Sequence, residues 1–224
     1  MRAPLSELPA ITADVLERIR ERRPRVHCIT NAVAQNFTAN MLLAAGAVPS
    51  MTIAQKEVRA FAARADAVLV NLGTFDIERQ KASVAAIAVA NKRGAPWVLD
   101  PVFIDRSPPR AAFAKTLLAK KPRAIRLNAA EFGALSGGKT DDAALARFAK
   151  ARRTVVGLTG QHDFIHDGTR LATIANGDPL MARVTAMGCV ASALVGAALA
   201  VERVDRIENF RGEAAGSARS TAPR

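Results

Sequence analysis

Short apolar runs alternate with longer amphipathic stretches along most of the chain. Runs rich in β-branched and other apolar residues predict buried strands at 26–29, 67–72, 96–99, 124–127 and 154–158, and a further short apolar stretch covers 47–51. Helical spacing predicts helices at about 32–45, 55–64, 77–93, 111–120, 140–152 and 191–201, and one more that opens at Asn128. The turn at 166–169 predicts a hairpin between 164–165 and 171–174. This alternation predicts an α/β protein whose mostly parallel central sheet is flanked by helices on both faces.

Polar residues and glycines gather where the predicted strands end. The positions concerned are Thr30, Asn31, Asn71, Gly73, Thr74, Asp100, Asn128, Thr159 and Gly160. Ligands of parallel sheets bind beyond the carboxyl ends of the strands. The recurrence of such residues favours an enzyme or a small-molecule binder over a scaffold.

Length and composition narrow the class further. The chain has 224 residues, of which 50% are hydrophobic, and this suffices for one domain with a full core. No apolar run reaches the roughly 18 residues that a membrane span requires, and the N-terminus lacks the order of a secretory signal. Cys28 and Cys189 are far apart and form no disulfide or metal pattern, so we expect a cytoplasmic protein that binds no membrane.

The net charge of +12 raises the alternative of a nucleic-acid binder. However, the basic residues are spread over helical stretches at 18–25, 115–123 and 147–153, aromatic residues make up only 4%, and Tyr is absent. No stacking motif accompanies the charge. We interpret it as solvated helix faces, part of which can steer an anionic substrate, and we expect no nucleic-acid partner.

Residues 184–193 contain small side chains and a glycine, and they lead into the apolar helix predicted at 191–201. Such a turn exposes the first N–H groups of the helix, which together with the helix dipole bind anions such as phosphate. Cys189 lies at that positive end, where a thiol loses its proton more easily than in water. The alternative is a tight helix start with an inert, buried cysteine.

Several segments together resemble the hydroxyethylthiazole kinase family. They are 26–31, 36–40, 46–51, 71–74, 99–102, 126–131 and the Cys189 segment, and they follow the family's order from about Val26 to Glu202. Each motif alone is modest, but the ordered set is specific. The resemblance implies a ribokinase-like α/β fold in a single kinase domain over residues 1–202.

The resemblance also implies an activity and partners. Family members transfer the γ-phosphate of ATP, with Mg²⁺, to the hydroxyl of 4-methyl-5-(2-hydroxyethyl)thiazole in thiamine salvage. They are homotrimers, and the thiazole pocket lies at the boundary between subunits. The expected partners are therefore the thiazole, ATP and two further copies of the chain.

Matching positions suggest individual roles. Cys189 corresponds to the cysteine beside the substrate hydroxyl, where it either accepts the proton or orients the group. Asp100 and Glu131 match carboxylates that help to hold Mg²⁺. On the nucleotide side, the matches are Arg126, Thr159, Gly160 and Gly188, with Asp163 nearby. On the substrate side, they are Met51, Asn31 and Ala186.

Several of these residues have structural alternatives. Asp100 is also a typical turn residue before a proline, and Glu131 can form a capping box with Asn128. A methionine such as Met51 is more often part of a core. His27 has the alternative of a strand-end histidine satisfied by the neighbouring backbone, and His162 and His166 are expected in loops.

The chain departs from the family pattern at two places. Ala186 stands where the family often has glycine, and its Cβ can crowd a ligand. Residues 203–224 are polar and rich in Gly, Ser and Ala, and we expect a shortened or divergent, partly disordered tail there. This leaves the alternative of a catalytically impaired relative that binds thiazole or nucleotide without turnover. A kinase for a pyrimidine or pyridoxal-type alcohol is a third possibility, against which the motifs at 26–51 argue.

Overall fold

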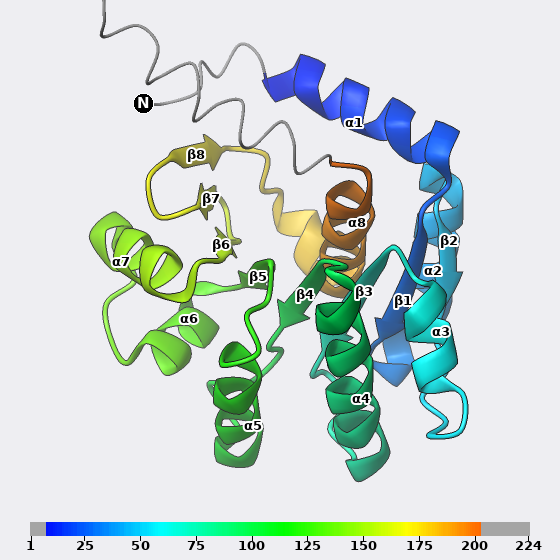
Figure 1. Cartoon of the computed structure of the whole chain (residues 1–224). Coiled ribbons are helices and arrows are strands. Elements are labelled where there is room, and N and C mark those ends of the chain that lie inside the picture. The colour runs from blue at the N-terminus through cyan, green and yellow to red at the C-terminus, as the bar shows by residue number, and fades with distance from the viewer. Residues whose placement is uncertain (1–7, 203–224) are drawn as a thin grey trace, which may run out of the picture.

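The computed structural model describes residues 8–202 and contains one eight-stranded sheet (Figure 1). Its strand order is β2-β1-β3-β4-β5-β6-β7-β8. The strands are β1 (Arg25–Ile29), β2 (Val48–Ser50), β3 (Ala67–Asn71), β4 (Trp97–Asp100), β5 (Ala124–Leu127), β6 (Val155–Leu158), β7 (Asp163–His166) and β8 (Leu171–Ile174). Neighbours from β2 to β6 pair in parallel, and β7 and β8 add antiparallel. The predicted mostly parallel sheet is therefore confirmed.

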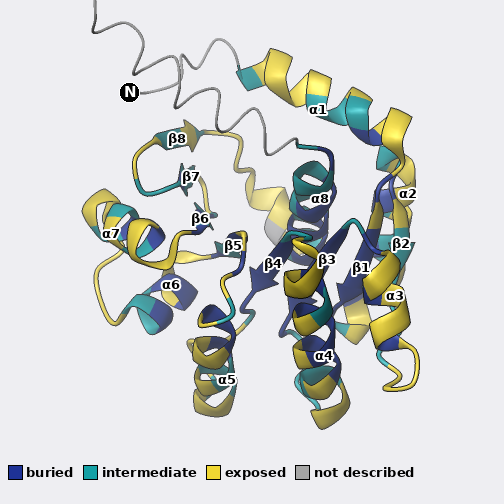
Figure 2. Cartoon of the chain, in the orientation of Figure 1, coloured by how far each residue is buried: buried dark blue, intermediate teal, exposed yellow. Residues whose placement is uncertain are grey.

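Helices cover both faces of the sheet. The α-helices are α1 (Leu8–Arg22), α2 (Gln35–Ala45), α3 (Val58–Arg64), α4 (Ile77–Arg93), α5 (Pro108–Leu118), α6 (Ala129–Ser136), α7 (Asp142–Arg152) and α8 (Met187–Val201). Two short 3₁₀ helices are η2 (Ala32–Ala34) and η3 (Pro179–Arg183). One core lies between the sheet and α3 to α7, and a second lies under α1, α2 and α8. Figure 2 shows the central strands buried between these layers.

Helix α8 crosses the middle of the sheet at close range. It packs on β1, β3 and β4, and small residues such as Ala193, Gly196 and Ala197 face the strands. At Gly196 an added Cβ would touch the Val26 side chain at 3.4 Å. This close approach brings the N-terminus of α8 to the carboxyl ends of β3 and β4.

The far end of α8 is held by α1. The Val201 carbonyl accepts hydrogen bonds from Arg22 at 2.9 Å and Arg18 at 3.5 Å, and Arg18 also pairs with Glu202 at 2.7 Å. Cationic groups at a helix C-terminus are favourable because they face the negative end of its dipole. Helix α1 was not among the helices predicted from the sequence.

Most other predicted elements are confirmed to within a few residues, including the 77–93 helix and the 164–174 hairpin. Helix α3 begins later than predicted, because 51–57 form a loop in which the Thr52 hydroxyl donates to Glu57 at 3.0 Å. His166 lies in β7, not in a loop, and is buried. The predicted tail at 203–224 lies outside the described residues. Among the helices of 8–202, none has the length and apolar character to cross a membrane.

Candidate active site

Four side chains from β3, β4 and α8 form a buried cluster at the carboxyl edge of the sheet. We call Asn71, Asp100, Cys189 and Ser192 the central cluster. Asn71 and Asp100 end neighbouring strands and are register partners. The Asn71 amide nitrogen donates to Asp100 Oδ2 at 2.7 Å and lies 3.3 Å from Cys189 Sγ, and Ser192 donates to the same carboxylate oxygen at 2.8 Å. One hydrogen-bonded unit thus links both strand ends to the helix.

Asp100 is fully buried, and only one of its oxygens has a partner within the described residues. Burial raises its pKa from 3.8 to about 6, while the positive charge of Arg126 and the bond from Ser192 act in the opposite direction. A buried acceptor without a partner is costly unless a ligand satisfies it. Its Oδ1 atom is therefore available to a cation or to the donor of a bound substrate.

Cys189 is a thiol, contrary to the expectation of easy deprotonation. Burial, and after it the neighbouring negative charge of Asp100, raise its pKa from 9.0 to about 11. The Asn71 bond and the charge of Arg126 oppose these effects without overcoming them. The stabilisation of a thiolate by the helix N-terminus is therefore outweighed by the burial of the sulfur and by the negative charge of Asp100.

The first turn of α8 presents backbone amides without a side-chain cap. Ala186 is the N-cap residue, and its side chain makes no capping hydrogen bond. Its φ of 66° lies in the left-handed region, which glycine adopts without steric cost. The free amides and the helix dipole make this turn suitable for a phosphate group.

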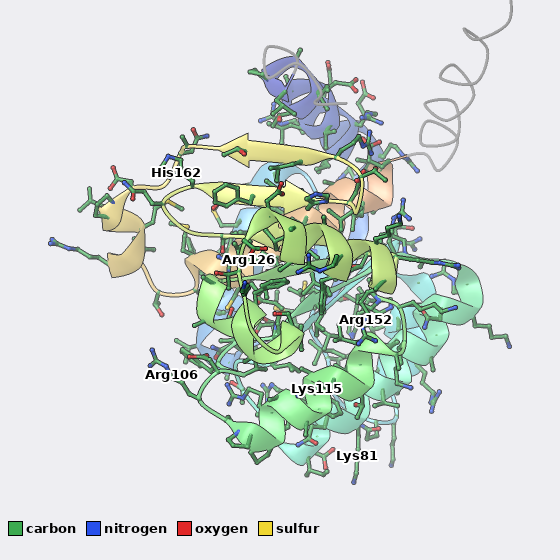
Figure 3. The ribbon with its side chains drawn as sticks, turned by 90° about the vertical axis from the view of Figure 1, so that its left-hand side faces the viewer. Lys81, Arg106, Lys115, Arg126, Arg152 and His162 are labelled. Atoms are coloured by element: carbon green, nitrogen blue, oxygen red, sulfur yellow. The ribbon has the colours of Figure 1, made fainter. Side chains whose placement is uncertain are left out.

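Arg126 approaches this turn from β5. Its guanidinium lies so close to Gly188 that an added Cβ would overlap with Nη1. The Nε atom of Arg126 is buried and has no hydrogen-bond partner within residues 8–202. In Figure 3, Arg126 lies within the outline of the molecule, whereas Arg106 projects from its edge. Arg126 and Gly188, both predicted on the nucleotide side, are thus brought together.

Glu131 forms the predicted capping box with Asn128 at the start of α6. Its Oε2 accepts the Asn128 amide at 2.9 Å, the Asn128 side chain accepts the Glu131 amide at 2.9 Å, and Oε1 accepts the Phe103 amide at 3.0 Å. These bonds tie the β5–α6 turn to the loop after Asp100. Each oxygen retains one lone pair for a metal-bound water.

Thr159 and Gly160 lie where β6 ends, beside β5. The Thr159 amide donates to the Leu127 carbonyl at 2.8 Å, and the Gly160 amide donates to Asp163 Oδ1 at 2.9 Å. Asp163 thus holds the turn, and the Gly160 amide is engaged within it. His162 is exposed in the same turn (Figure 3).

The predicted substrate side lies across the cluster, at β1 and β2. Asn31 caps η2 by accepting the Val33 amide at 3.0 Å and also accepts the Thr74 hydroxyl at 3.1 Å. An added Cβ at Gly73 would lie 2.6 Å from the Asn31 side chain, so only glycine allows this approach. Met51 is half-buried just after β2 and packs against the core beneath α8.

Sequence reasoning missed two members of the central cluster as site residues, Asn71 and Ser192. Asn71 was noted only as a polar strand end. Ser192 follows Cys189 by three residues, a spacing that places both on one face of a helix. That spacing is the signal that could have identified it.

The site offers one carboxylate, that of Asp100, as a ligand for Mg²⁺. Among residues 8–202 no three His, Cys, Asp or Glu side chains gather into a metal-binding cluster. Mg²⁺ itself requires only one or two protein carboxylates, because it keeps several waters. The unpartnered Asp100 Oδ1 meets this need, whereas Glu131 is occupied by amides.

Similarity to a solved structure identifies the fold class of the protein. A ribokinase-like superfamily protein from Enterococcus faecalis V583 superposes with a TM-score of 0.65 at 15% identity, over 90% of this chain and 82% of that one. The protein therefore has the ribokinase-like fold that was expected from the resemblance.

Closer relatives identify the family. The hydroxyethylthiazole kinase family model matches residues 16–215. A hydroxyethylthiazole kinase of Klebsiella pneumoniae is 46% identical over 90% of this chain and 83% of its own length. The structure of hydroxyethylthiazole kinase protein from Pyrococcus horikoshii OT3 has a TM-score of 0.83 at 39% identity and covers 87% of this chain and 78% of that one. The chain belongs to the hydroxyethylthiazole kinase family and is a kinase.

Proposed function

We propose that this protein transfers the γ-phosphate of ATP to the hydroxyl of 4-methyl-5-(2-hydroxyethyl)thiazole in thiamine salvage. The single observation that carries the proposal is the position of the central cluster beneath the uncapped first turn of α8. Phosphoryl transfer depends on positioning and on neutralising charge, and this arrangement offers both. The relatives named hydroxyethylthiazole kinase supply the acceptor.

The first turn of α8 and Arg126 hold the transferred phosphoryl group in this proposal. Amides of the first turn face the charge that develops on its oxygens. Arg126 adds a guanidinium directly beside Gly188 of this turn, and Thr159 and Gly160 border the nucleotide at the end of β6. Mg²⁺, when bound, neutralises phosphate charge, and Asp100 is the residue that would hold it, with Glu131 acting through water.

Cys189 orients the acceptor hydroxyl and does not remove its proton, because its thiol stays protonated at neutral pH. Asn71 donates to the sulfur, which fixes the direction of the side chain. The S–H group is then free to contact the hydroxyl oxygen. Asn31, Ala186 and Met51 border the heterocycle.

We further propose a cytoplasmic homotrimer built from a single kinase domain over 1–202. The β2 edge of the sheet and the neighbouring η2, α2 and α3 expose Val33, Leu43, Val48 and Phe61. Figure 2 shows α3 largely exposed. Exposed apolar side chains at this edge of the sheet are available for an interface with a further copy of the chain. Contact there would place a neighbouring subunit close to Met51.

The test is ADP release from MgATP with the thiazole alcohol as acceptor, beside pyridoxal and a hydroxymethylpyrimidine. We expect thiazole-dependent turnover that Asp100→Asn abolishes. Turnover with only the other two alcohols would contradict the proposed acceptor. A folded protein that binds the thiazole without releasing ADP would instead support the binding-only alternative, which neither the structure nor the relatives favour.

A further inference from the structure

His27 is a fully buried histidine in β1 that none of the roles above uses. Its ring lies on the sheet face covered by α3, 6.1 Å from the Phe61 ring. Its register partner is Ser50, the last residue of the edge strand β2. The His27 imidazole therefore links β1 to the edge strand β2 by a side-chain contact, in addition to the backbone pairing of the two strands.

The imidazole contacts the chain directly before Met51. Its Nδ1 atom lies 2.9 Å from Ser50 Oγ, whereas its Nε2 atom is buried without a hydrogen-bond partner among the described residues. Burial lowers the pKa of the ring from 6.5 to about 4, so the ring is neutral near pH 7. A neutral ring has one donor and one acceptor nitrogen, and the Ser50 hydroxyl can pair with Nδ1 in either role.

Met51 lies on the opposite face of this strand end. Side chains alternate between the two faces, and Met51 packs with the core that contains Ala193 of α8, whereas Ser50 bonds to His27 on the α3 side. The His27 ring therefore supports the residues around Met51 from behind. β2 is three residues long and, in the described sheet, pairs only with β1, so the contact of Ser50 with His27 adds to a short ladder of backbone bonds.

We propose that His27 is a positioning residue that holds Ser50, the last residue of β2, in place and so sets the position of the adjoining Met51 against the heterocycle. This inference rests on the proposed function, in which Met51 lines the thiazole pocket. It makes His27 a determinant of acceptor binding that does not touch the acceptor. The nucleotide side, at β5 and α8, is independent of this contact.

The kinetic test uses His27→Leu, His27→Asn and Ser50→Ala. We expect His27→Leu to raise KM for the thiazole alcohol about tenfold, with kcat and KM for ATP within about twofold, since only acceptor binding is affected. His27→Asn keeps a hydrogen-bonding group near Nδ1 and should recover part of the loss. The Ser50→Ala effect should not add to that of His27→Leu, because both remove one interaction.

The matched control is His166→Leu. His166 is also a buried histidine, but it lies in β7 and accepts the Gly168 amide at 2.8 Å. This variant should lose stability without a change in KM for the thiazole alcohol. An equal rise in KM in both leucine variants would overturn the proposal, because it would reveal a general loss of structure.

A second readout does not depend on turnover. With ¹³C-methyl methionine, the Met51 methyl signal should shift in the His27 and Ser50 variants and stay in place in His166→Leu. If the wild type does not phosphorylate the thiazole, the proposed function fails while this signal still decides the positioning role. An unmoved Met51 signal in His27→Leu and His27→Asn overturns the role even if the kinase assay succeeds.

Discussion

The guanidinium of Arg126 lies directly against the backbone of Gly188, in the space that any larger side chain would occupy. Gly188→Ala should therefore displace Arg126 and weaken the phosphate site. The loss of one charge-assisted contact corresponds to about 2 kcal/mol, or a rise in KM for ATP of roughly 30-fold. Steady-state kinetics at saturating acceptor measure this. The control is Gly138→Ala, where an added Cβ meets no neighbour, and an equal change in both variants would disprove the explanation.

Ala186→Gly should stabilise the protein. Ala186 has a φ of 66°, a left-handed conformation that costs a residue with a Cβ about 1 kcal/mol or more. The greater freedom of glycine in the unfolded chain offsets part of this gain. We expect a rise in Tm of about 2 °C by thermal unfolding.

The reverse substitution serves as the control. Gly94 has a φ of 69° with open space around it, so Gly94→Ala isolates the backbone cost. It should lower Tm by a similar amount. A lower Tm in Ala186→Gly would mean that the Cβ at position 186 makes a contact worth more than the strain.

Asp100→Asn should abolish turnover and yet stabilise the ligand-free protein at pH 8. The pKa of Asp100 is raised to about 6, so the folded state holds its proton more tightly than the unfolded state. Its contribution to the free energy of unfolding is present below about pH 4 and is lost as the pH rises through 6. The stability gap between the variant and the wild type should grow over this range to on the order of 1–3 kcal/mol.

Chemical denaturation at pH 4, 6 and 8 measures that gap. Asp100→Asn must be compared with the wild type at each pH, because His27 also titrates in this range. Burial lowers the pKa of His27, so its contribution to the free energy of unfolding is lost as the pH falls from 6.5 to 4, opposite to that of Asp100. Mg²⁺ should raise the Tm of the wild type and leave that of Asp100→Asn unchanged. No gap at pH 8 would show that Asp100 is stable as a carboxylate without a ligand.

Cys189→Ser should keep turnover within about tenfold of the wild type, since a hydroxyl can orient the acceptor as a thiol does. The pKa of Cys189 is raised to about 11, so kcat should show no rise that tracks thiolate formation between pH 7 and 9. Iodoacetamide should modify the residue slowly, because the thiolate is the reactive form. Rapid alkylation at pH 7 would contradict a buried thiol.

The sequence predicted the layers of the fold and the edge at which the site lies, because strand ends of a parallel sheet converge whatever their distance along the chain. Asn71 and Asp100 illustrate this, since both stood out as polar residues that end apolar runs. What it could not predict was the balance of local electrostatics. The helix N-terminus favours a Cys189 thiolate, but a carboxylate brought in by another strand outweighs it.

Two further features were not predicted from the pattern of hydrophobic and polar residues. Helix α1 exposes most of its residues and buries only Ile19, and its C-terminal arginines bond to α8, a segment distant in the sequence. His166 is the last residue of β7 and pairs with Val156 of β6, so the strand extends one residue beyond the predicted start of the turn.

Two arginines of α1 bond to Val201 at the negative end of α8, while the positive end of α8 faces the proposed phosphate site. A helix of 15 residues is about 22 Å long and hardly compressible, so a displacement of α1 would be transmitted to the amides at the opposite end of α8. In the proposed kinase, α1 would thus set the depth of the phosphate site although it carries no reacting group.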